Sequence, residues 1–395
     1  MIKMKKRAFA LTLAGVMLAT LLAVFGGFCV FAQIKDVKLV QTDDYDTLMD
    51  MSEKYGKLYT MQKTIEEQFL WKVDEEKQMD AIYKALAESL GDKYSVYMNA
   101  EETEKWNRYV TGVFTGVGIT FVETENGDFL ITGVMDGGPA DIGGLKEGDK
   151  IRKVDGKEFS DSDRVVAALQ GKKGSQVKVT YERKNETKTV SLVRSEVEEP
   201  SVYAGVLDSG YGYIQITAFE KTTAEQFATE LAGFENKKVP GLIIDLRGNP
   251  GGLMDPSVEI ADLLLPECNI MHTEDSKGEK KYYNSDEKCT GLPYILLIDE
   301  KSASASEILA AAVKDNEGGA LVGVKSFGKG IVQSQMEFAD HSSLKLTTMQ
   351  YLSPKNHKIH KTGVSPDYTV KQPAGSKRDK QLQKAVSLLS KEKNR

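Results

Sequence analysis

The stretch Tyr294-Ile-Leu-Leu-Ile-Asp-Glu-Lys-Ser-Ala-Ser-Ala-Ser-Glu-Ile308 joins an apolar run to a serine-rich segment that opens a second apolar run. Five consecutive apolar residues bounded by polar ones are typical of a strand buried on both faces. The residues from 306 to 313 predict a helix that follows almost at once. A buried strand followed by a helix indicates an α/β domain.

The same alternation continues on the amino-terminal side of this stretch. We expect strands at 211–216 and 241–246, and helices at 224–234 and 257–265. The fold class predicted for the chain as a whole is mixed α/β and multidomain, because the residues before Pro200 follow other patterns.

Residues 110–196 show short apolar segments separated by turn residues, which predict a small β-rich domain. Asn126-Gly127 is a strong hairpin signal between strands expected at 114–121 and 129–134. The remaining elements expected here are strands at 151–154, 177–181 and 189–193, a short helix or turn at 139–144, and a helix at 161–170.

The N-terminus carries a membrane signal. Residues 1–7 include four basic side chains and no acidic ones, and the 25 residues from Ala8 to Ala32 are uncharged. About 20 apolar residues cross a bilayer, and the basic flank predicts a cytoplasmic N-terminus with the rest outside. Val30-Phe31-Ala32 leaves open a cleaved signal and secretion, but the apolar region exceeds the ~7–15 residues of a signal. We expect an uncleaved single-pass anchor at 8–32 and a helical region at 41–109.

Composition restricts the classes of function. The chain has 395 residues, with 58 acidic and 52 basic side chains. This acidic balance argues against nucleic acid as a partner. Three cysteines, four histidines and the lack of an HExxH motif predict no metal and no cofactor. Cys268 and Cys289 could pair outside the membrane or remain free thiols, and the sequence leaves both open.

Ser304 is the first candidate for chemistry, because it lies where the expected strand gives way to the expected helix. A hydroxyl there lies at the positive end of the helix dipole, and backbone N–H groups can stabilise an oxyanion. Glu307 follows at the spacing of a capping box, so helix capping alone also explains the pair.

Lys329 is the second candidate, in the segment Ser326-Phe-Gly-Lys-Gly-Ile-Val-Gln333. If this segment is a strand, Lys329, Ile331 and Gln333 share one face. A lysine that acts as a general base must be neutral, so burial must lower its pKa from about 10.4 to ~7–8. The alternative is a glycine-rich surface turn with a solvated lysine.

Asp245-Leu-Arg-Gly-Asn-Pro-Gly-Gly252 follows another expected buried strand. The N–H groups of Gly251 and Gly252 suit an oxyanion site or anion nest. Asp245 and Arg247 could equally form a structural ion pair within an ordinary turn.

Gly116-Val-Gly-Ile119 opens the β-rich domain. Successive N–H groups of Gly116, Val117 and Gly118 could bind a peptide carboxylate, with the peptide added as an extra strand. A dinucleotide loop is excluded because Phe121 stands where the third glycine is needed.

Together these segments resemble the carboxy-terminal processing peptidases, also called tail-specific proteases, over about residues 41–391. The order of the motifs and the 25-residue gap from Ser304 to Lys329 make the resemblance specific. It rests on Leu90-Gly-Asp-Lys-Tyr-Ser-Val-Tyr-Met98, the stretch 110–196, Asp245–Gly252, Ser302-Ala-Ser-Ala-Ser-Glu307, Gly328-Lys-Gly-Ile-Val-Gln333 and Gly363-Val-Ser-Pro-Asp367.

The resemblance implies a serine endopeptidase with a Ser–Lys dyad. Ser304 is then the nucleophile, Lys329 the general base and Gln333 the residue that orients Lys329. The Ala305 N–H and one of Gly251 or Gly252 form the oxyanion hole.

The resemblance also implies a PDZ domain at 110–196, a ClpP/crotonase-like peptidase domain at 197–375, and a final helix at 376–395. Ile119 and Phe121 would line a groove for protein or peptide substrates with apolar C-termini. An inactive PDZ-type receptor or scaffold is the alternative, and a homo-oligomer stays open. One departure is Gln170-Gly-Lys, where many relatives have Arg-Gly-Lys, which puts the coupling of the PDZ domain to the active site in doubt.

Overall fold

The computed structural model describes residues 6–34, 41–124, 126–198, 200–373, 375–376 and 378–392. The chain divides into two compact units, Met1–Met79 and Asp80–Arg395. Residues 1–5 and 393–395, the outer parts of the expected cytoplasmic N-terminus and final helix, lie outside the described residues.

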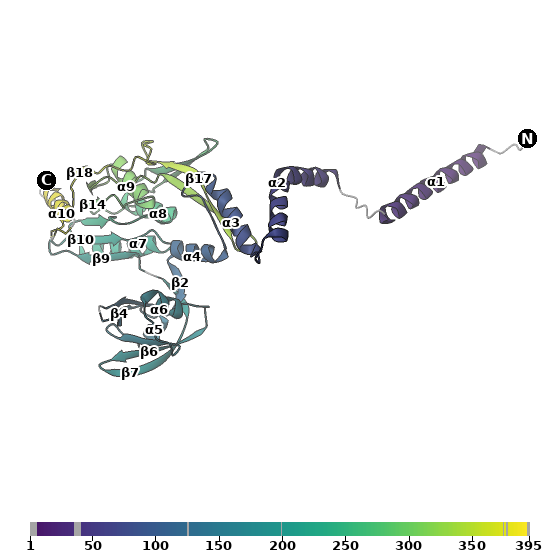
Figure 1. Ribbon diagram of the computed structural model, residues 1–395. Helices are drawn as coiled ribbons and strands as arrows, with labels where there is room; N and C mark the ends of the chain where they lie inside the picture. The colour runs from purple at the N-terminus through teal and green to yellow at the C-terminus, as the bar shows by residue number, and fades with distance from the viewer. Residues whose placement is uncertain are drawn as a thin grey trace, which may run out of the picture. The chain divides into compact units, whose positions relative to one another are not determined.

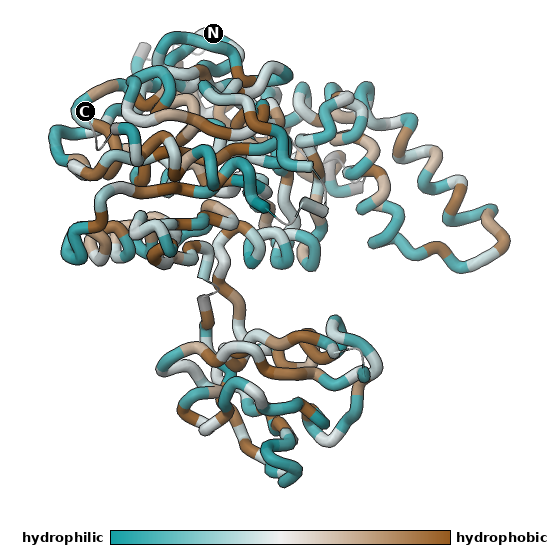
Figure 2. The backbone as a smooth tube through the Cα atoms, turned by 90° about the vertical axis from the view of Figure 1, so that its left-hand side faces the viewer, coloured by the Kyte–Doolittle hydropathy of each residue, from teal (hydrophilic) through white to brown (hydrophobic). Residues whose placement is uncertain are grey.

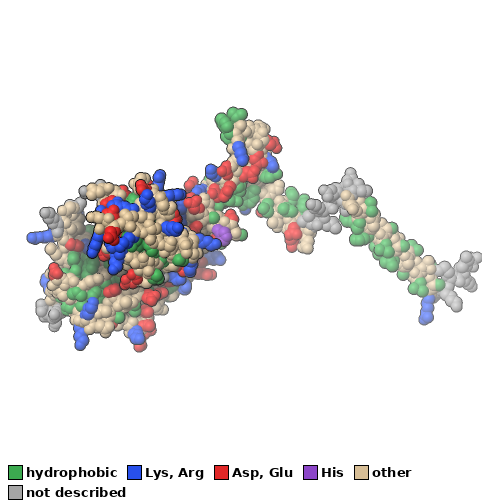
Figure 3. Space-filling model, turned by 90° about the horizontal axis from the view of Figure 1, so that it is seen from below, with side chains coloured by type: hydrophobic (Ala, Val, Ile, Leu, Met, Phe, Trp, Pro, Cys, Tyr) green, Lys and Arg blue, Asp and Glu red, His purple; other side chains and the backbone are tan. Residues whose placement is uncertain are grey.

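The first unit is helical. It contains α1 (Lys6–Ile34), α2 (Thr42–Gln68) and the beginning of α3 (Glu75–Glu88). Within α1, residues 7–31 are long and apolar enough to cross a membrane, as a membrane span or a signal sequence would be. Figure 3 shows hydrophobic side chains along α1, with a basic side chain near its N-terminal end.

The second unit begins within α3. Its first complete elements are β1 (Val96–Met98) and α4 (Ala100–Thr111), and the β-rich domain follows them. Its sheet has the strand order β3-β4-β5-β6-β7, all antiparallel, and β2 pairs with β8. One apolar cluster fills its core, built on residues such as Ile131, Val165 and Val177. The elements are β2 (Val113–Gly116), β3 (Ile119–Glu123), β4 (Phe129–Val134), α5 (Pro139–Ile142), β5 (Lys150–Val154), α6 (Ser162–Leu169), β6 (Gln176–Arg183), β7 (Glu186–Val193) and β8 (Ser195–Glu198).

A mostly parallel sheet carries the α/β part of the chain (Figure 1). Its strand order is β18-β15-β14-β11-β10-β9, and only β9 runs antiparallel to its neighbour. The central strand β14 is buried at every residue, as its continuous apolar run predicts. The strands are β9 (Val202–Val206), β10 (Gly212–Ile216), β11 (Leu242–Asp245), β14 (Tyr294–Ile298), β15 (Ala320–Gly323) and β18 (Tyr368–Thr369).

Helices cover both faces of this sheet because alternate strand residues point to opposite sides. Ile244 and Leu296 pack in the cluster with α7 (Thr223–Lys237), α8 (Met254–Leu264) and α9 (Ala305–Asp315). Their neighbours Ile243 and Ile295 pack with α10 (Lys380–Glu392). Figure 2 shows hydrophobic residues concentrated along these strands.

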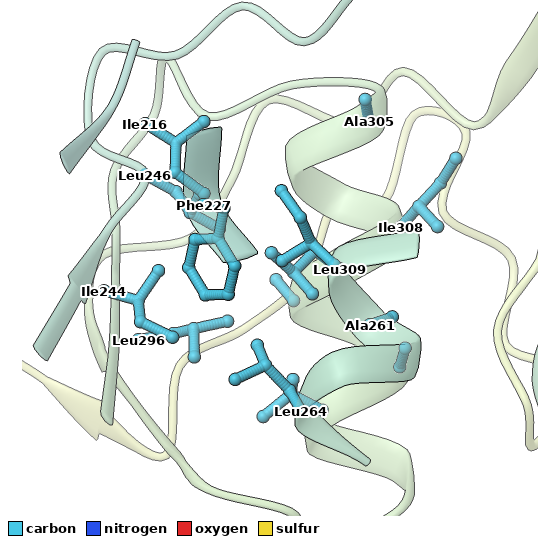
Figure 4. Packing of buried hydrophobic residues seen from close by; sticks show 14 of the residues in the cluster. Ile216, Phe227, Ile244, Leu246, Ala261, Leu264, Leu296, Ala305, Ile308 and Leu309 are labelled. Carbon is cyan, nitrogen blue, oxygen red and sulfur yellow. The ribbon is translucent and has the colours of Figure 1, made fainter. Parts of the chain in front are cut away.

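Close packing fixes α9 against the sheet. In Figure 4, Phe227 of α7 lies between Ile244 and Leu246 on one side and Leu309 of α9 on the other. Because interiors pack at the density of organic crystals, α9 has little freedom to shift. The start of α9 therefore has a defined place at the carboxyl ends of β11 and β14.

The chain also forms a second, antiparallel sheet. It has the order β1-β17-β12-β13, and β16 also pairs with β17. Besides β1, its strands are β12 (Asn269–Asp275), β13 (Lys280–Asn284), β16 (Ile331–Glu337) and β17 (Ser343–Leu352).

One local expectation is wrong, and one question that the sequence left open is answered. The strand expected at 114–121 is interrupted by Val117 and Gly118, because Gly118 has a φ of +73° that an extended strand does not adopt. Cys268 and Cys289 are free thiols. Cys268 packs against the core with its Sγ 3.2 Å from the Ser285 hydroxyl, whereas the Cys289 side chain is exposed.

Candidate active site

Three serines follow β14, and their environments separate them. Ser302 donates its hydroxyl to the Leu246 carbonyl at 2.8 Å, and Ser306 donates to the Asn249 carbonyl at 3.1 Å. Both are fully buried and tie this segment to the loop after β11. Ser304 lies between them and is half-buried. Ser304 is therefore the serine with access to a reactant.

Ser304 has an unusual backbone. Its φ is +55° and its ψ is −112°, in a region that L-residues seldom occupy and that costs on the order of 1–3 kcal/mol. It immediately precedes Ala305, the first residue of α9. The turn brings Ser304 close to Gly251, where an added Cβ would lie 2.7 Å from the Ser304 Cβ. A side chain at position 251 would therefore displace Ser304.

The buried side chain of Asn249 organises the glycine loop opposite Ser304. Its Nδ2 donates to the Ile216 carbonyl at 2.9 Å, and its Oδ1 accepts the Gly251 N–H at 2.8 Å. Among the hydrogen bonds of the described residues, neither the Gly252 N–H nor the Ala305 N–H has a backbone or side-chain acceptor. These two N–H groups are available to a ligand oxygen, whereas that of Gly251 is not.

Glu307 has more than a capping role. Its side chain is completely buried, and its Oε2 accepts the Ser304 N–H at 2.9 Å and the Lys329 N–H at 2.7 Å. Its Oε1 accepts the Ser326 hydroxyl at 2.5 Å and the Gly328 N–H at 2.7 Å. One carboxylate thus holds the serine segment and the lysine segment together.

Lys329 lies in a loop rather than in a strand, because its N–H is bound to Glu307 and β16 begins only at Ile331. The prediction that Lys329, Ile331 and Gln333 share one face of a strand is therefore wrong. The neighbouring glycine permits close packing, since an added Cβ at Gly330 would lie 2.3 Å from the His360 nitrogen.

The environment of Lys329 shifts its protonation equilibrium towards the neutral amine. Burial lowers the pKa of its ammonium and nearby Lys93 lowers it further, while the charges of Glu307 and Asp92 act in the opposite direction. Its Nζ lies 5.0 Å from the centroid of the Tyr94 ring. The solvated surface lysine considered from the sequence is not what the structure shows.

Tyr351 of β17 contacts both segments. Its hydroxyl lies 2.9 Å from the Ser304 carbonyl oxygen and 2.8 Å from that of Lys329. The residue is 2% exposed. Sequence reasoning missed Tyr351 because no local pattern marks it, while Glu307 was seen only as a capping partner.

Gln333 lies on β16 next to a register shift between Val332 and Gln333. Its Nε2 lies 3.5 Å from the Thr347 hydroxyl on β17. Asp245 and Arg247 form an ion pair at 2.5 Å, which Arg247 extends to Asp379 at 2.8 Å. This pair has the structural role that the sequence left open, since it ties the loop after β11 to the residues that precede α10.

A cavity of about 460 Å³ opens beside the lysine. Its largely apolar wall could receive an apolar side chain next to Ser304, because Ala303 belongs to the lining. The lining residues are Tyr94, Gly248, Pro250, Glu300, Lys301, Ala303, Phe327 and Lys329. Among the described residues, no group of three or more His, Cys, Asp or Glu side chains is placed to hold a metal ion.

The β-rich domain has an open sheet edge beside residues 116–119. Strand β3 is at the edge of its sheet, with β4 as its neighbour in that sheet. The Val117 and Gly118 carbonyls accept the N–H groups of Ala140 and Met135 at 2.8 and 2.9 Å. Within the described chain the N–H groups of Val117 and Gly118 have no such partners. An edge strand beside free N–H groups suits strand addition with carboxylate binding.

The geometry is that of a serine peptidase with an added peptide-binding domain. Residues 210–370 match the family model described as peptidase family S41, and residues 115–193 match the model of the PDZ domain.

The carboxy-terminal processing protease CtpA of Bacillus subtilis (strain 168) is 34% identical over 325 residues, which cover 81% of this chain and 70% of CtpA. CtpB of the same organism is 33% identical over 391 residues, which cover 94% of this chain and 79% of CtpB. A solved structure of a photosystem II D1 C-terminal processing protease is 27% identical, with a TM-score of 0.49. The match covers 85% of this chain and 92% of that protease. The chain belongs to the carboxy-terminal processing proteases, and it is a serine-type endopeptidase with a PDZ domain.

Proposed function

We propose that Ser304 is the nucleophile of this protease and that Lys329 is its general base. The observation that carries the proposal is the shared carboxylate oxygen of Glu307, which binds the N–H groups of both residues. The lowered pKa of Lys329 suits the removal of a proton from a hydroxyl. Gln333 orients Lys329 from β16.

The acyl-transfer step follows from these roles. The Ser304 hydroxyl attacks the substrate carbonyl carbon, and its proton passes to the neutral Lys329 amine. The oxyanion that forms accepts hydrogen bonds from the N–H groups of Ala305 and Gly252. Gly252 takes this role rather than Gly251, whose N–H is bound to Asn249. Lys329 then returns the proton to the leaving amine, and water hydrolyses the acyl-enzyme.

The test uses the full-length protein in detergent with a fluorophosphonate probe and a fluorogenic peptide. S304A should abolish labelling, and S304A and K329A should each lower turnover by more than about a hundredfold, the lower end for losing a general base. The double variant should be hardly worse than either single one. Gln333→Ala should be milder, because it orients the base and transfers no proton.

Lys325, an exposed lysine four residues before Lys329, provides the control, and K325A should be unaffected. Turnover should rise with pH as Lys329 loses its proton. A folded K329A variant that keeps turnover within tenfold of wild type would exclude the lysine as the base.

We propose that the PDZ domain binds apolar C-termini of protein substrates and so raises their local concentration at the active site. The support is the edge strand β3, on which Ile119 and Phe121 pack against the domain core while remaining partly accessible. Gln170 stands where many relatives have an arginine, which favours simple tethering over gating of the active site.

We propose that α1 is an uncleaved anchor and that the catalytic domain is extracytoplasmic. The uncharged length of α1 and the preceding basic residues support this orientation. The mass of the protein purified from membranes tests it, since cleavage after Ala32 would remove the anchor.

A further inference from the structure

Two buried side chains of opposite hydrogen-bonding character hold Ser304 and Lys329. Glu307 Oε2 accepts the N–H of both residues, at 2.9 and 2.7 Å. The Tyr351 hydroxyl lies 2.9 and 2.8 Å from the carbonyl oxygens of the same two residues. The backbone N–H and C=O of each residue are therefore both held by hydrogen bonds, although the two residues are 25 positions apart in the sequence.

Tyr351 differs from Glu307 in where it comes from. Glu307 belongs to α9, three residues after Ser304, whereas Tyr351 belongs to β17 of the antiparallel sheet. The Tyr351 N–H also donates to the Gly330 carbonyl at 3.1 Å, so its backbone is bound to the lysine loop as well. The tyrosine is thus the point at which a third element sets the spacing of the two segments.

The phenol can serve both carbonyls only by sharing its single proton between them. Burial and the charge of Glu307 raise the pKa of the Tyr351 phenol well above its usual range. The phenol therefore keeps its proton, and remains a hydrogen-bond donor, at neutral pH. A shared donor is most favourable when both carbonyls are close to the hydroxyl. It therefore opposes separation of the serine and lysine segments.

We propose that Tyr351 is a positioning residue for the peptidase reaction, whose hydroxyl holds the Ser304 and Lys329 segments at the spacing that proton transfer needs. The inference rests on the proposed dyad and concerns how the dyad is aligned. Tyr351 does not touch the reacting hydroxyl or amine in this role; it acts through the backbone of the two residues that carry them.

A single substitution can separate the alignment of Ser304 and Lys329 from the stability of the fold. Tyr351→Phe removes one oxygen and keeps the ring in the core. A misplacement of about 1 Å at a reacting centre can lower the rate by about a hundredfold. We expect kcat to fall between tenfold and a hundredfold while KM for a short peptide stays within about threefold. Looser packing admits water to Lys329, so the rising limb of the pH profile should move to higher pH.

Tyr294→Phe is the matched control. Tyr294 is also a buried tyrosine of the peptidase core, and its hydroxyl donates to one backbone carbonyl, that of Leu264, at 3.1 Å. Y294F should lower the melting temperature without changing kcat or the pH profile of the folded protein. Both variants are compared with wild type at full length in detergent, with melting curves and fluorophosphonate labelling in parallel.

The outcomes decide the proposal. A folded Y351F variant with kcat within twofold of wild type and an unchanged pH profile overturns it, as does a loss equal to that of Y294F. If Y351F does not fold, p-aminophenylalanine at position 351 takes its place, since it keeps an N–H donor. Turnover within tenfold of wild type then supports the inference, and a larger loss in a folded protein rejects it.

Failure of the proposed dyad gives another result. If S304A still labels and cleaves, the nucleophile itself is wrong. If S304A and K329A are both inactive while Y351F is normal, the dyad stands and only the role of Tyr351 is rejected.

Discussion

Replacing Glu307 with glutamine tests whether one buried carboxylate organises the site. The amide replaces one carboxylate oxygen with an NH2 group. Turned one way, the NH2 group faces the Ser304 and Lys329 N–H groups; turned the other way, it faces the Gly328 N–H, while the Ser326 hydroxyl can rotate and accept a hydrogen bond from it. At least one buried N–H group therefore loses its acceptor. Each buried donor without an acceptor costs about 1–3 kcal/mol. The variant should therefore lose about 1–3 kcal/mol of stability.

A capping role alone predicts a smaller effect. Glutamine serves at the third position of a capping box as glutamate does, so a capping role alone predicts a loss well below the ~1 kcal/mol of a lost cap. In a domain of 150–250 residues, 1 kcal/mol shifts the melting temperature by roughly 2–4 °C. We expect the peptidase transition of E307Q to move down by roughly 2–12 °C. Labelling of Ser304 should also slow in the fraction that remains folded.

Differential scanning calorimetry of the full-length protein, with fluorophosphonate labelling below the transition, measures both effects. Glu317→Gln is the matched control, because that carboxylate is 87% exposed and lies 3.8 Å from Lys355. An exposed pair of this kind contributes ~0–1 kcal/mol. If E307Q melts within about 2 °C of E317Q and labels at the wild-type rate, Glu307 is only a helix cap and the reasoning is refuted.

Two further predictions concern Lys329 and the PDZ groove. Burial depresses the folded-state pKa of Lys329. Between that pKa and ~10.4, the unfolded chain therefore binds more protons than the folded chain. The free-energy cost of keeping the ammonium buried is largest below this pH window. Lys329→Met should therefore raise the melting temperature at pH 7 while abolishing turnover, and a gain that does not shrink towards pH 10 would contradict this. For the PDZ domain, a peptide with a free apolar C-terminus should inhibit cleavage of a protein substrate but leave short-peptide turnover unchanged, and C-terminal amidation should abolish the inhibition; activation of short-peptide turnover would instead show gating.

Local sequence determined much of the architecture. The apolar run at 294–298 forms the buried central strand β14, and the serine-rich segment after it leads into α9. The hairpin signal at Asn126-Gly127 lies between β3 and β4 as expected. These features depend on side chains within a few positions of one another, so periodicity and turn chemistry reveal them. The order of the motifs also determined the family.

Tertiary structure alone decided how the site is assembled. Ser302 and Ser306 are excluded as nucleophiles by hydrogen bonds to a loop more than 50 residues earlier in the chain. The availability of the Gly252 N–H depends on Asn249, which engages Gly251 instead. Tyr351 reaches Ser304 only because β17 crosses the site in the second sheet. Such contacts depend on which distant strands pair and how helices pack against them, and no residue pattern within one segment carries that information.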